Sequence, residues 1–277
     1  MHELDQIKAP VASYVDDFHS QFASILATKS EWLEQAIQHL NASTGKKVRP
    51  ILTALMAGLV GSGEPSPKSI DAAVLLELIH TATLIHDDVI DEAKTRRGQP
   101  TLGAIFDNRV AVLMGNYYEI IYQKTAVLFR SCAEVAAITM EATPEALEQA
   151  VQIGTALGMA FQIRDDIFDY YRSDVGKPTG NDLREGKVTL PLLHVLLELQ
   201  AEGKAEPYLQ LLEDKPITDE AVERLTALAF DAGGIDYAWQ KLYSYIEEAK
   251  TLLRTFEESP YRSSLLALAD YIASRTH

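Results

Sequence analysis

Two stretches of this sequence each carry three aspartates at the spacing of a helix face. The first is "LIHDDVIDEAKTRRG" at 84–98 and the second is "QIRDDIFDY" at 162–170. Residues three or four positions apart share one face of an α-helix, so each triplet is expected to project its carboxylates from one side of a helix end. The six residues are Asp87, Asp88, Asp91, Asp165, Asp166 and Asp169.

Clustered carboxylates repel one another, and apolar surroundings would raise their pKa values unless a cation were supplied. Hard oxygen ligands without a nearby cysteine favour Mg²⁺ or Mn²⁺ over Zn²⁺. One such triplet would be explained as well by a solvated helix end. Two copies, each ending an apolar helix and each followed by a basic or Gly-Lys loop, favour metal binding.

Basic residues close to both triplets predict that an anion, such as a diphosphate, binds with the metal. A further basic segment, "TGKKVRP" at 44–50, lies at the start of an expected helix, where free backbone N–H groups favour anions. For a single lysine, a solvated surface charge is the alternative, although the neighbours of Lys124 resemble core residues. His80 is either a phosphate donor or a satisfied core histidine. The basic candidates are Lys46, Lys47, Arg49, Arg96, Arg97, Lys124, Lys177 and Lys187.

The composition limits the classes of protein that need to be considered. A formal charge of −15 over 277 residues argues against a nucleic-acid-binding protein, because no broad basic surface is available. The single cysteine, Cys132, excludes an intrachain disulfide and is expected to be a small buried residue. The start of the chain shows no signal peptide, and the apolar stretch at 72–85 is interrupted by charge and too short to span a bilayer. We therefore expect a cytoplasmic protein without a membrane span.

The elements that must position these residues are helices. Apolar residues recur at helical spacing, and the segments between turns are rich in helix formers, which predicts an all-α protein. No flexible linker divides the chain, so a single domain over 1–277 with two facing acidic helices is expected. The expected helices lie near 11–27, 30–40, 48–60, 68–91, 103–114, 117–140, 144–171, 188–200, 218–230, 234–257 and 260–275.

Taken together, these motifs resemble the head-to-tail, all-trans isoprenyl (polyprenyl) diphosphate synthases. The resemblance runs in the family's order from "GKKVRP" through "HTATLIHDDVIDEAKTRRG" and "YQKTA" to "FQIRDDIFDY" and "DVGKPTGNDLREGKVTLPLL". It implies the isoprenoid synthase fold, a helical barrel around a deep apolar cavity. The two acidic helices would face each other across the cavity mouth and hold about three Mg²⁺ ions.

By the family pattern, the site residues divide by the group that they bind. The metal-associated residues would be Asp87, Asp88, Asp91, Asp165 and Asp169, with Asp166 completing the motif. The allylic diphosphate would be bound by Arg96, Lys124, Gln162, Lys177 and Lys187, and isopentenyl diphosphate by Lys46, Arg49, His80 and Arg97. The expected catalytic set is Asp87, Asp88, Asp91, Asp165, Lys124 and Lys187.

The resemblance also implies the reaction and a product class. Positive charge stabilises the departing diphosphate, the allylic cation is attacked by isopentenyl diphosphate, and the proton leaves to the released diphosphate. In the family, a bulky aromatic residue about one turn before the first triplet gives short products. The small Ala82 and Thr83 at this place favour a medium- or long-chain polyprenyl product, with a farnesyl or geranylgeranyl product as the alternative.

The sequence departs from the family at one junction. Between "VLMGN" and "YYEIIYQKT" the family has a further stretch of about two helices, whereas Asn116 here adjoins Tyr117. In relatives this stretch helps to wall the cavity and to form a homodimer. The gap is either a true deletion or a segment absent from the sequence as given. We favour the second, because a true deletion would expose apolar cavity wall.

Other classes fit less well. A terpene cyclase would not need the second diphosphate site that "GKKVRP" and "RRG" supply. A phosphohydrolase would need further histidine ligands beside His86 and Asp87, and a di-iron protein would need a second Glu-x-x-His besides Glu77 and His80. A non-catalytic partner subunit of a heteromeric synthase would be expected to have lost aspartates.

Overall fold

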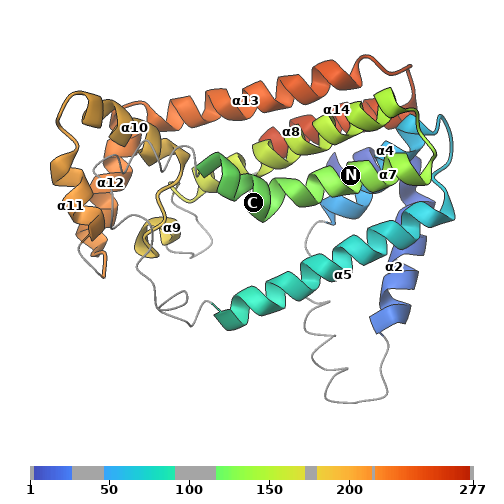
Figure 1. Cartoon of the computed structure of the whole chain (residues 1–277), viewed down its shortest axis with the longest axis horizontal. Helices are drawn as coiled ribbons and strands as arrows, with labels where there is room; N and C mark the ends of the chain where they lie inside the picture. Colours follow the sequence, from blue (N-terminus) through green and yellow to red (C-terminus); the bar gives the residue numbers. More distant parts are fainter. Residues whose placement is uncertain (1–2, 27–46, 91–116, 172–179, 214–215, 275–277) are drawn as a thin grey trace. The chain divides into compact units, whose positions relative to one another are not determined.

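The computed structural model describes residues 3–26, 47–90, 117–171, 180–213 and 216–274, without the side chains of residues 82 and 84–90. Every regular element in these ranges is helical, which confirms the all-α prediction (Figure 1). The elements are α1 (Glu3–Lys8), η1 (Ala9–Val11), α2 (Ala12–Leu26), α4 (Val48–Val60), α5 (Pro67–Ile90), η3 (Tyr122–Ala126), α7 (Val127–Thr139), α8 (Pro144–Phe168), α9 (Asn181–Arg184), α10 (Leu190–Ala201), α11 (Glu206–Glu213), α12 (Asp219–Asp231), α13 (Gly234–Leu253) and α14 (Pro260–Ser274).

Three of these helices begin where a hydroxyl residue caps the first turn. The side chains of Thr143, Thr218 and Ser259 each accept a hydrogen bond from the backbone N–H three residues later, at 3.1–3.2 Å. Such a cap satisfies one of the free N–H groups of the first turn. Proline follows the cap in α8 and α14, where its missing N–H is not needed. These starts therefore follow from local sequence.

The chain divides into two compact units. The first comprises Met1–Lys94, Val127–Leu157 and Glu248–His277, and the second comprises Thr95–Ala126 and Gly158–Glu247. Helices α8 and α13 contribute residues to both. The first aspartate triplet falls in the first unit and the second triplet in the second. That the whole chain is one domain stays a prediction.

The first unit is built around α4. This helix packs against α2, α5, α7 and α14 (Figure 1). Its Leu52, Leu55 and Met56 are fully buried. A helix that is buried all round must be apolar all round, as α4 is. Helix α8 crosses α7 closely at Gly154, where an added Cβ would lie 2.7 Å from the carbonyl oxygen of Phe129.

The second unit has its own core. Helix α10 packs on α12, which also contacts α9 and α11. Ile163 and Ile167 of α8 and Leu193 of α10 are fully buried. Helix α13 begins at Gly234, where an added Cβ would lie 2.1 Å from the carbonyl oxygen of Pro191. Only glycine permits this close approach of α13 to α10.

The expected helices are confirmed within the described residues, with a few differences. The short elements α1, η1, α9 and α11 were not predicted. The expected helix at 188–200 begins at Leu190, and the helix from residue 117 to residue 139 contains the π-turn η3. The expected helices at 30–40 and 103–114 lie outside the described residues. Among the described helices, none combines the length and the apolar character that crossing a membrane requires.

Candidate functional site

The three aspartates of the second triplet lie in different surroundings. Asp165 is exposed, Asp166 is buried with 5% of its surface exposed, and Asp169 follows the last residue of α8. The expectation that all three carboxylates project from one side of the helix end is therefore wrong for Asp166. Neighbouring residues on an α-helix point about 100° apart, so Asp165 and Asp166 could not share one direction.

Asp166 is held by two donors inside the second unit. The Tyr117 hydroxyl donates to its Oδ2 at 2.7 Å, and Gln162 Nε2 donates to its Oδ1 at 2.8 Å. Gln162 Oε1 in turn accepts a hydrogen bond from the Thr125 hydroxyl. Burial raises the pKa of the Asp166 carboxyl to about 7, although both hydrogen bonds act in the opposite direction. Both side-chain ends of Gln162, a predicted substrate ligand, are thus engaged within the protein.

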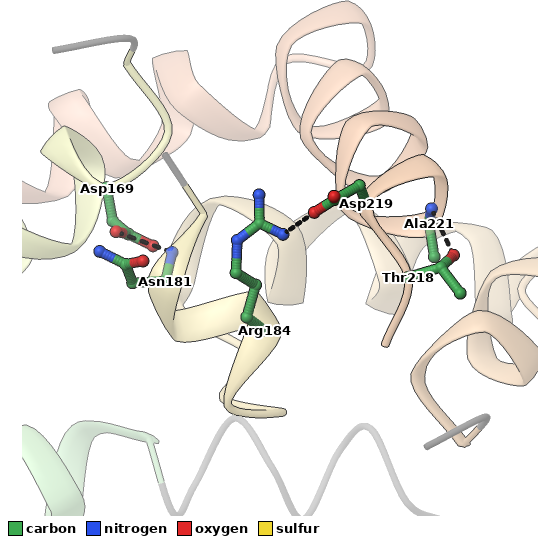
Figure 2. Close-up of polar contacts among 6 residues, drawn as sticks. All are labelled: Asp169, Asn181, Arg184, Thr218, Asp219 and Ala221. Atoms are coloured by element: carbon green, nitrogen blue, oxygen red, sulfur yellow. Dashed lines mark hydrogen bonds and ion pairs between the residues drawn. The ribbon is translucent and has the colours of Figure 1, made fainter. Parts of the chain in front are cut away.

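Asp169 clamps the chain that follows the triplet. Its carboxylate accepts a hydrogen bond from the backbone N–H of Asn181 at 3.1 Å, drawn in Figure 2, and one from that of Asp182 at 2.9 Å. Its carbonyl accepts one from the backbone N–H of Gly180 at 2.9 Å. Gly180 has φ 73°, a left-handed conformation that favours glycine. The carboxylate therefore fixes the start of α9 against the end of α8.

The other end of α9 is held by an ion pair. Arg184 at its C-terminus pairs with Asp219 in the first turn of α12, and Figure 2 shows this contact beside the Asp169 clamp. The turn leads to Lys187, which is exposed, pairs with Glu185, and donates its backbone N–H to the Asp182 carbonyl at 2.7 Å. The predicted anion ligand Lys187 is thus joined by backbone contacts to the acidic helix end.

Asp182 is a further acidic residue beside this helix end, which the sequence did not indicate. Burial raises the pKa of its carboxyl and the nearby Asp169 charge raises it further, whereas Lys187 and Lys124 lower it. The motif "GNDLREGK" contained this aspartate, but nothing in its spacing distinguished it from a solvated helix-cap residue. Asp182 adds negative charge to a face that already carries Asp165 and Asp169.

Lys124 lies on the π-turn η3 and is exposed. Its positive charge lowers the pKa values of both Asp166 and Asp182, so the ammonium group lies within electrostatic range of these carboxylates. The second unit therefore brings together Lys124, a predicted allylic-diphosphate ligand, and the second acidic triplet.

In the first unit, the "GKKVRP" segment starts α4. Lys47 Nζ lies 2.9 Å from Glu77 Oε1 of α5, and this pair is largely buried. Lys47 therefore links two helices. The Arg49 guanidinium carbon lies 5.8 Å from the centroid of the Phe129 ring, and His80 is half-buried on α5.

The single cysteine, Cys132, is buried, as expected for a small apolar residue. This burial raises the pKa of its thiol to about 11.

Several predicted site residues lie wholly or with their side chains outside the described residues. Asp87 and Asp88 lie in the last turn of α5 and Ala82 lies in the same helix, but their side chains are outside the described residues. Thr83 is exposed, and its hydroxyl donates to the His80 carbonyl at 2.7 Å. Predicted residues wholly outside the described ranges are Lys46, Asp91, Arg96, Arg97 and Lys177.

The chemistry of the second acidic end fits a hard divalent cation. Among the residues with described side chains, no three histidine, cysteine, aspartate or glutamate side chains converge as a preformed metal site. This agrees with the burial of Asp166, which points away from the face that carries Asp165 and Asp169. Mg²⁺ commonly uses only a few carboxylates, with waters and phosphates completing its shell. The crowding of Asp169 and Asp182, which raises the pKa of Asp182, is the repulsion that a cation would relieve.

Comparison with known proteins gives a consistent family match. The family described as "Polyprenyl synthetase" matches residues 30–119 and 114–229. The octaprenyl diphosphate synthase of Haemophilus influenzae is 32% identical over 285 residues, covering 84% of this chain and 85% of that protein. The geranylgeranyl diphosphate synthase of Methanosarcina mazei is 30% identical over 333 residues, covering 99% of this chain and 98% of that protein.

A solved structure matches over nearly the whole chain. The polyprenyl synthase from Caulobacter crescentus CB15, complexed with calcium and isoprenyl diphosphate, has a TM-score of 0.81 and 26% identity. The match covers 99% of this chain and 98% of that one. These similar proteins include both short-chain and long-chain synthases, so the chain is similar to members of both product classes.

Proposed function

The chain belongs to the polyprenyl synthetase family, and on that premise we propose that it is a Mg²⁺-dependent trans-prenyltransferase. It joins an allylic diphosphate head to tail with isopentenyl diphosphate. The observation that carries this proposal is the acidic end of α8, where Asp165 is exposed, the Asp169 carboxylate accepts the backbone N–H of Asp182, and Lys124 lies within electrostatic range of Asp166 and Asp182. Carboxylates for a cation and lysines for an anion are what binding of a metal diphosphate requires.

In this mechanism the chain binds and orients the leaving group. Lys124 and Lys187 bind the oxygens of the allylic diphosphate and stabilise the negative charge that grows as its C–O bond breaks. The aspartates of each triplet would hold Mg²⁺, which would supply further positive charge to the departing diphosphate. Arg49 and His80 of the first unit orient isopentenyl diphosphate, whose double bond attacks the allylic cation. The proton leaves with the released diphosphate, so no side-chain base is needed.

A direct assay tests this function. The protein is incubated with radiolabelled isopentenyl diphosphate, an allylic diphosphate and Mg²⁺, and the products are extracted into organic solvent. Labelled polyprenyl product that disappears with EDTA supports the proposal. Hydrolysis without elongation would support the cyclase or phosphohydrolase alternatives, and no turnover would support a non-catalytic partner subunit. Adding candidate catalytic subunits would then identify the last case.

We further propose that the product is of medium or long chain. Thr83, Ile79 and Leu75 lie at four-residue intervals on α5 and are exposed, which gives one helix face leading away from the first triplet. Small residues beside the triplet followed by two large apolar ones suit a growing hydrocarbon chain.

Ala82→Tyr is expected to shorten the product by at least one five-carbon unit, because a phenol ring would obstruct the path one turn from Asp87. Product lengths measured by mass spectrometry check this expectation. Lys68→Tyr, which adds the same ring to an exposed site at the start of α5, serves as the control. An unchanged set of product lengths in Ala82→Tyr would remove this assignment of the chain path.

We also propose that a family segment is missing at the 116/117 junction and that relatives use it in a homodimer. The family match is made in two pieces that meet at residues 114–119. The alignment with the M. mazei protein has 333 positions, which exceeds the 277 residues of this chain by 56. A denatured mass of 30.6 kDa would establish a true deletion, whereas a greater mass would establish an absent segment. The mass of the native protein in solution, compared with the denatured mass of one chain, then tests whether the protein is a homodimer.

A further inference from the structure

The helix that carries Lys124 is interrupted by one wider turn. Residues 117–121 and 127–139 are α-helical, and Tyr122–Ala126 between them form the π-turn η3. A π-turn holds about one residue more than an α-turn and is found mainly at functional sites. The question is what the extra residue does here.

In a regular α-helix, Lys124 would return to the face of Tyr117, because seven residues make about two turns of 3.6 residues. With the extra residue, Thr125 reaches that face instead. The burial agrees: Tyr117 and Thr125 are 5% and 7% exposed, whereas Lys124 is exposed. The π-turn therefore removes the lysine from the contact with α8 and puts a hydroxyl in its place.

Both buried residues are attached to α8 by one chain of hydrogen bonds. The Tyr117 hydroxyl donates to Asp166, Gln162 donates to the other oxygen of Asp166, and Thr125 donates to Gln162. Gln162 and Asp166 lie one helical turn apart, and they hold Tyr117, which precedes the π-turn, and Thr125, which lies within it. The contacts therefore fix the π-turn against α8.

We propose that Tyr117 and Asp166 are positioning residues, which fix the π-turn through Gln162 and Thr125 and so aim Lys124 at a bound diphosphate. Asp166 acts by accepting these two hydrogen bonds and is not a ligand of the cation. Its carboxylate is buried and both of its oxygens already have donors, whereas Asp165 is exposed at the surface. The inference rests on the proposed function only for the identity of the anion.

Tyr117→Phe removes one hydroxyl and keeps the ring. It is expected to raise the KM for the allylic diphosphate about tenfold, since a buried carboxylate loses a charge-assisted hydrogen bond. The Mg²⁺ concentration for half-maximal rate should not change. Tyr118→Phe is the matched control, because that hydroxyl lies on the next residue and bonds to Tyr237 instead. Thermal unfolding of each variant ensures that assays are made on folded protein.

Two further variants separate positioning from other roles. Asp166→Asn removes the charge but keeps a polar partner for Gln162 and Tyr117, so it should need no more Mg²⁺ for half-maximal rate than the wild type. A cation ligand would instead lose rate and need more Mg²⁺, as expected for Asp165→Asn, and this result would overturn the proposal. In a Lys124→Ala background, Tyr117→Phe should have no further effect on KM, because its effect passes through Lys124. An equal effect in both backgrounds would show a merely structural role.

Binding of inorganic diphosphate with Mg²⁺, measured by calorimetry, gives a readout that does not depend on turnover. Weaker binding in Tyr117→Phe but not in Tyr118→Phe supports the positioning role even if no prenyl product forms. Equal binding in wild type and Tyr117→Phe contradicts it. Failure of the proposed function and failure of this inference are thus distinguished.

Discussion

Asp165→Ala is expected to lower kcat about a hundredfold or more and to raise the Mg²⁺ concentration needed for half-maximal rate. The reason lies in the second triplet itself. Asp166 is buried and Asp169 is engaged by two backbone N–H groups, so Asp165 is the member whose carboxylate is exposed at the end of α8. Its loss removes the principal carboxylate that this end offers to a cation.

The matched control for this prediction is Asp231→Ala, which removes an exposed aspartate from the end of α12 and should leave both quantities unchanged. Steady-state rates measured over a range of Mg²⁺ concentrations make the comparison. Asp87→Ala is expected to behave like Asp165→Ala. A near-normal rate in either variant would refute the metal assignment of that triplet.

Gly234→Ala is expected to destabilise the protein by about 3 kcal/mol. The added methyl carbon would lie 2.1 Å from the carbonyl oxygen of Pro191 and 2.8 Å from a methyl group of Val195. The first contact is with backbone, so α10 and α13 must move apart and lose packing in the core of the second unit.

Unfolding in urea, followed by circular dichroism, measures the change. Gly63→Ala is the control, because its added carbon would meet only one atom, at 3.9 Å, and its expected change is within about 0.5 kcal/mol. If Gly234→Ala unfolded at the same urea concentration as Gly63→Ala, the close approach of α13 to α10 would be wrong.

Much of the fold could be predicted because its signals are local. A threonine or serine followed by proline, as in Thr143–Pro144 and Ser259–Pro260, marks the start of a helix. Apolar residues at helical spacing mark the helices themselves. The short helix α9 was missed because four residues are too few to show periodicity. What holds it in place is the distant carboxylate of Asp169, which a local pattern cannot reveal.

The residue types of the candidate site could be predicted from the sequence, but the directions in which their side chains point could not. The motif "DDIFD" indicates a cluster of aspartates, yet which of Asp165 and Asp166 faces inward depends on the helix that packs against α8. The π-turn at Lys124 was also hidden, since a single extra residue does not change the composition of the helix. These features depend on tertiary contacts such as that between Tyr117 and Asp166.

The backbone clamp at Asp169 makes the acidic helix end and the segment that leads to Lys187 move as one piece. A cation that orders Asp165 at this helix end would therefore also reduce the freedom of the lysine, and a diphosphate that orders the lysine would do the same for the aspartate. Each ligand should then bind more tightly in the presence of the other, and by the same factor in both directions. The entropy lost by ordering this piece is borne by whichever ligand arrives first.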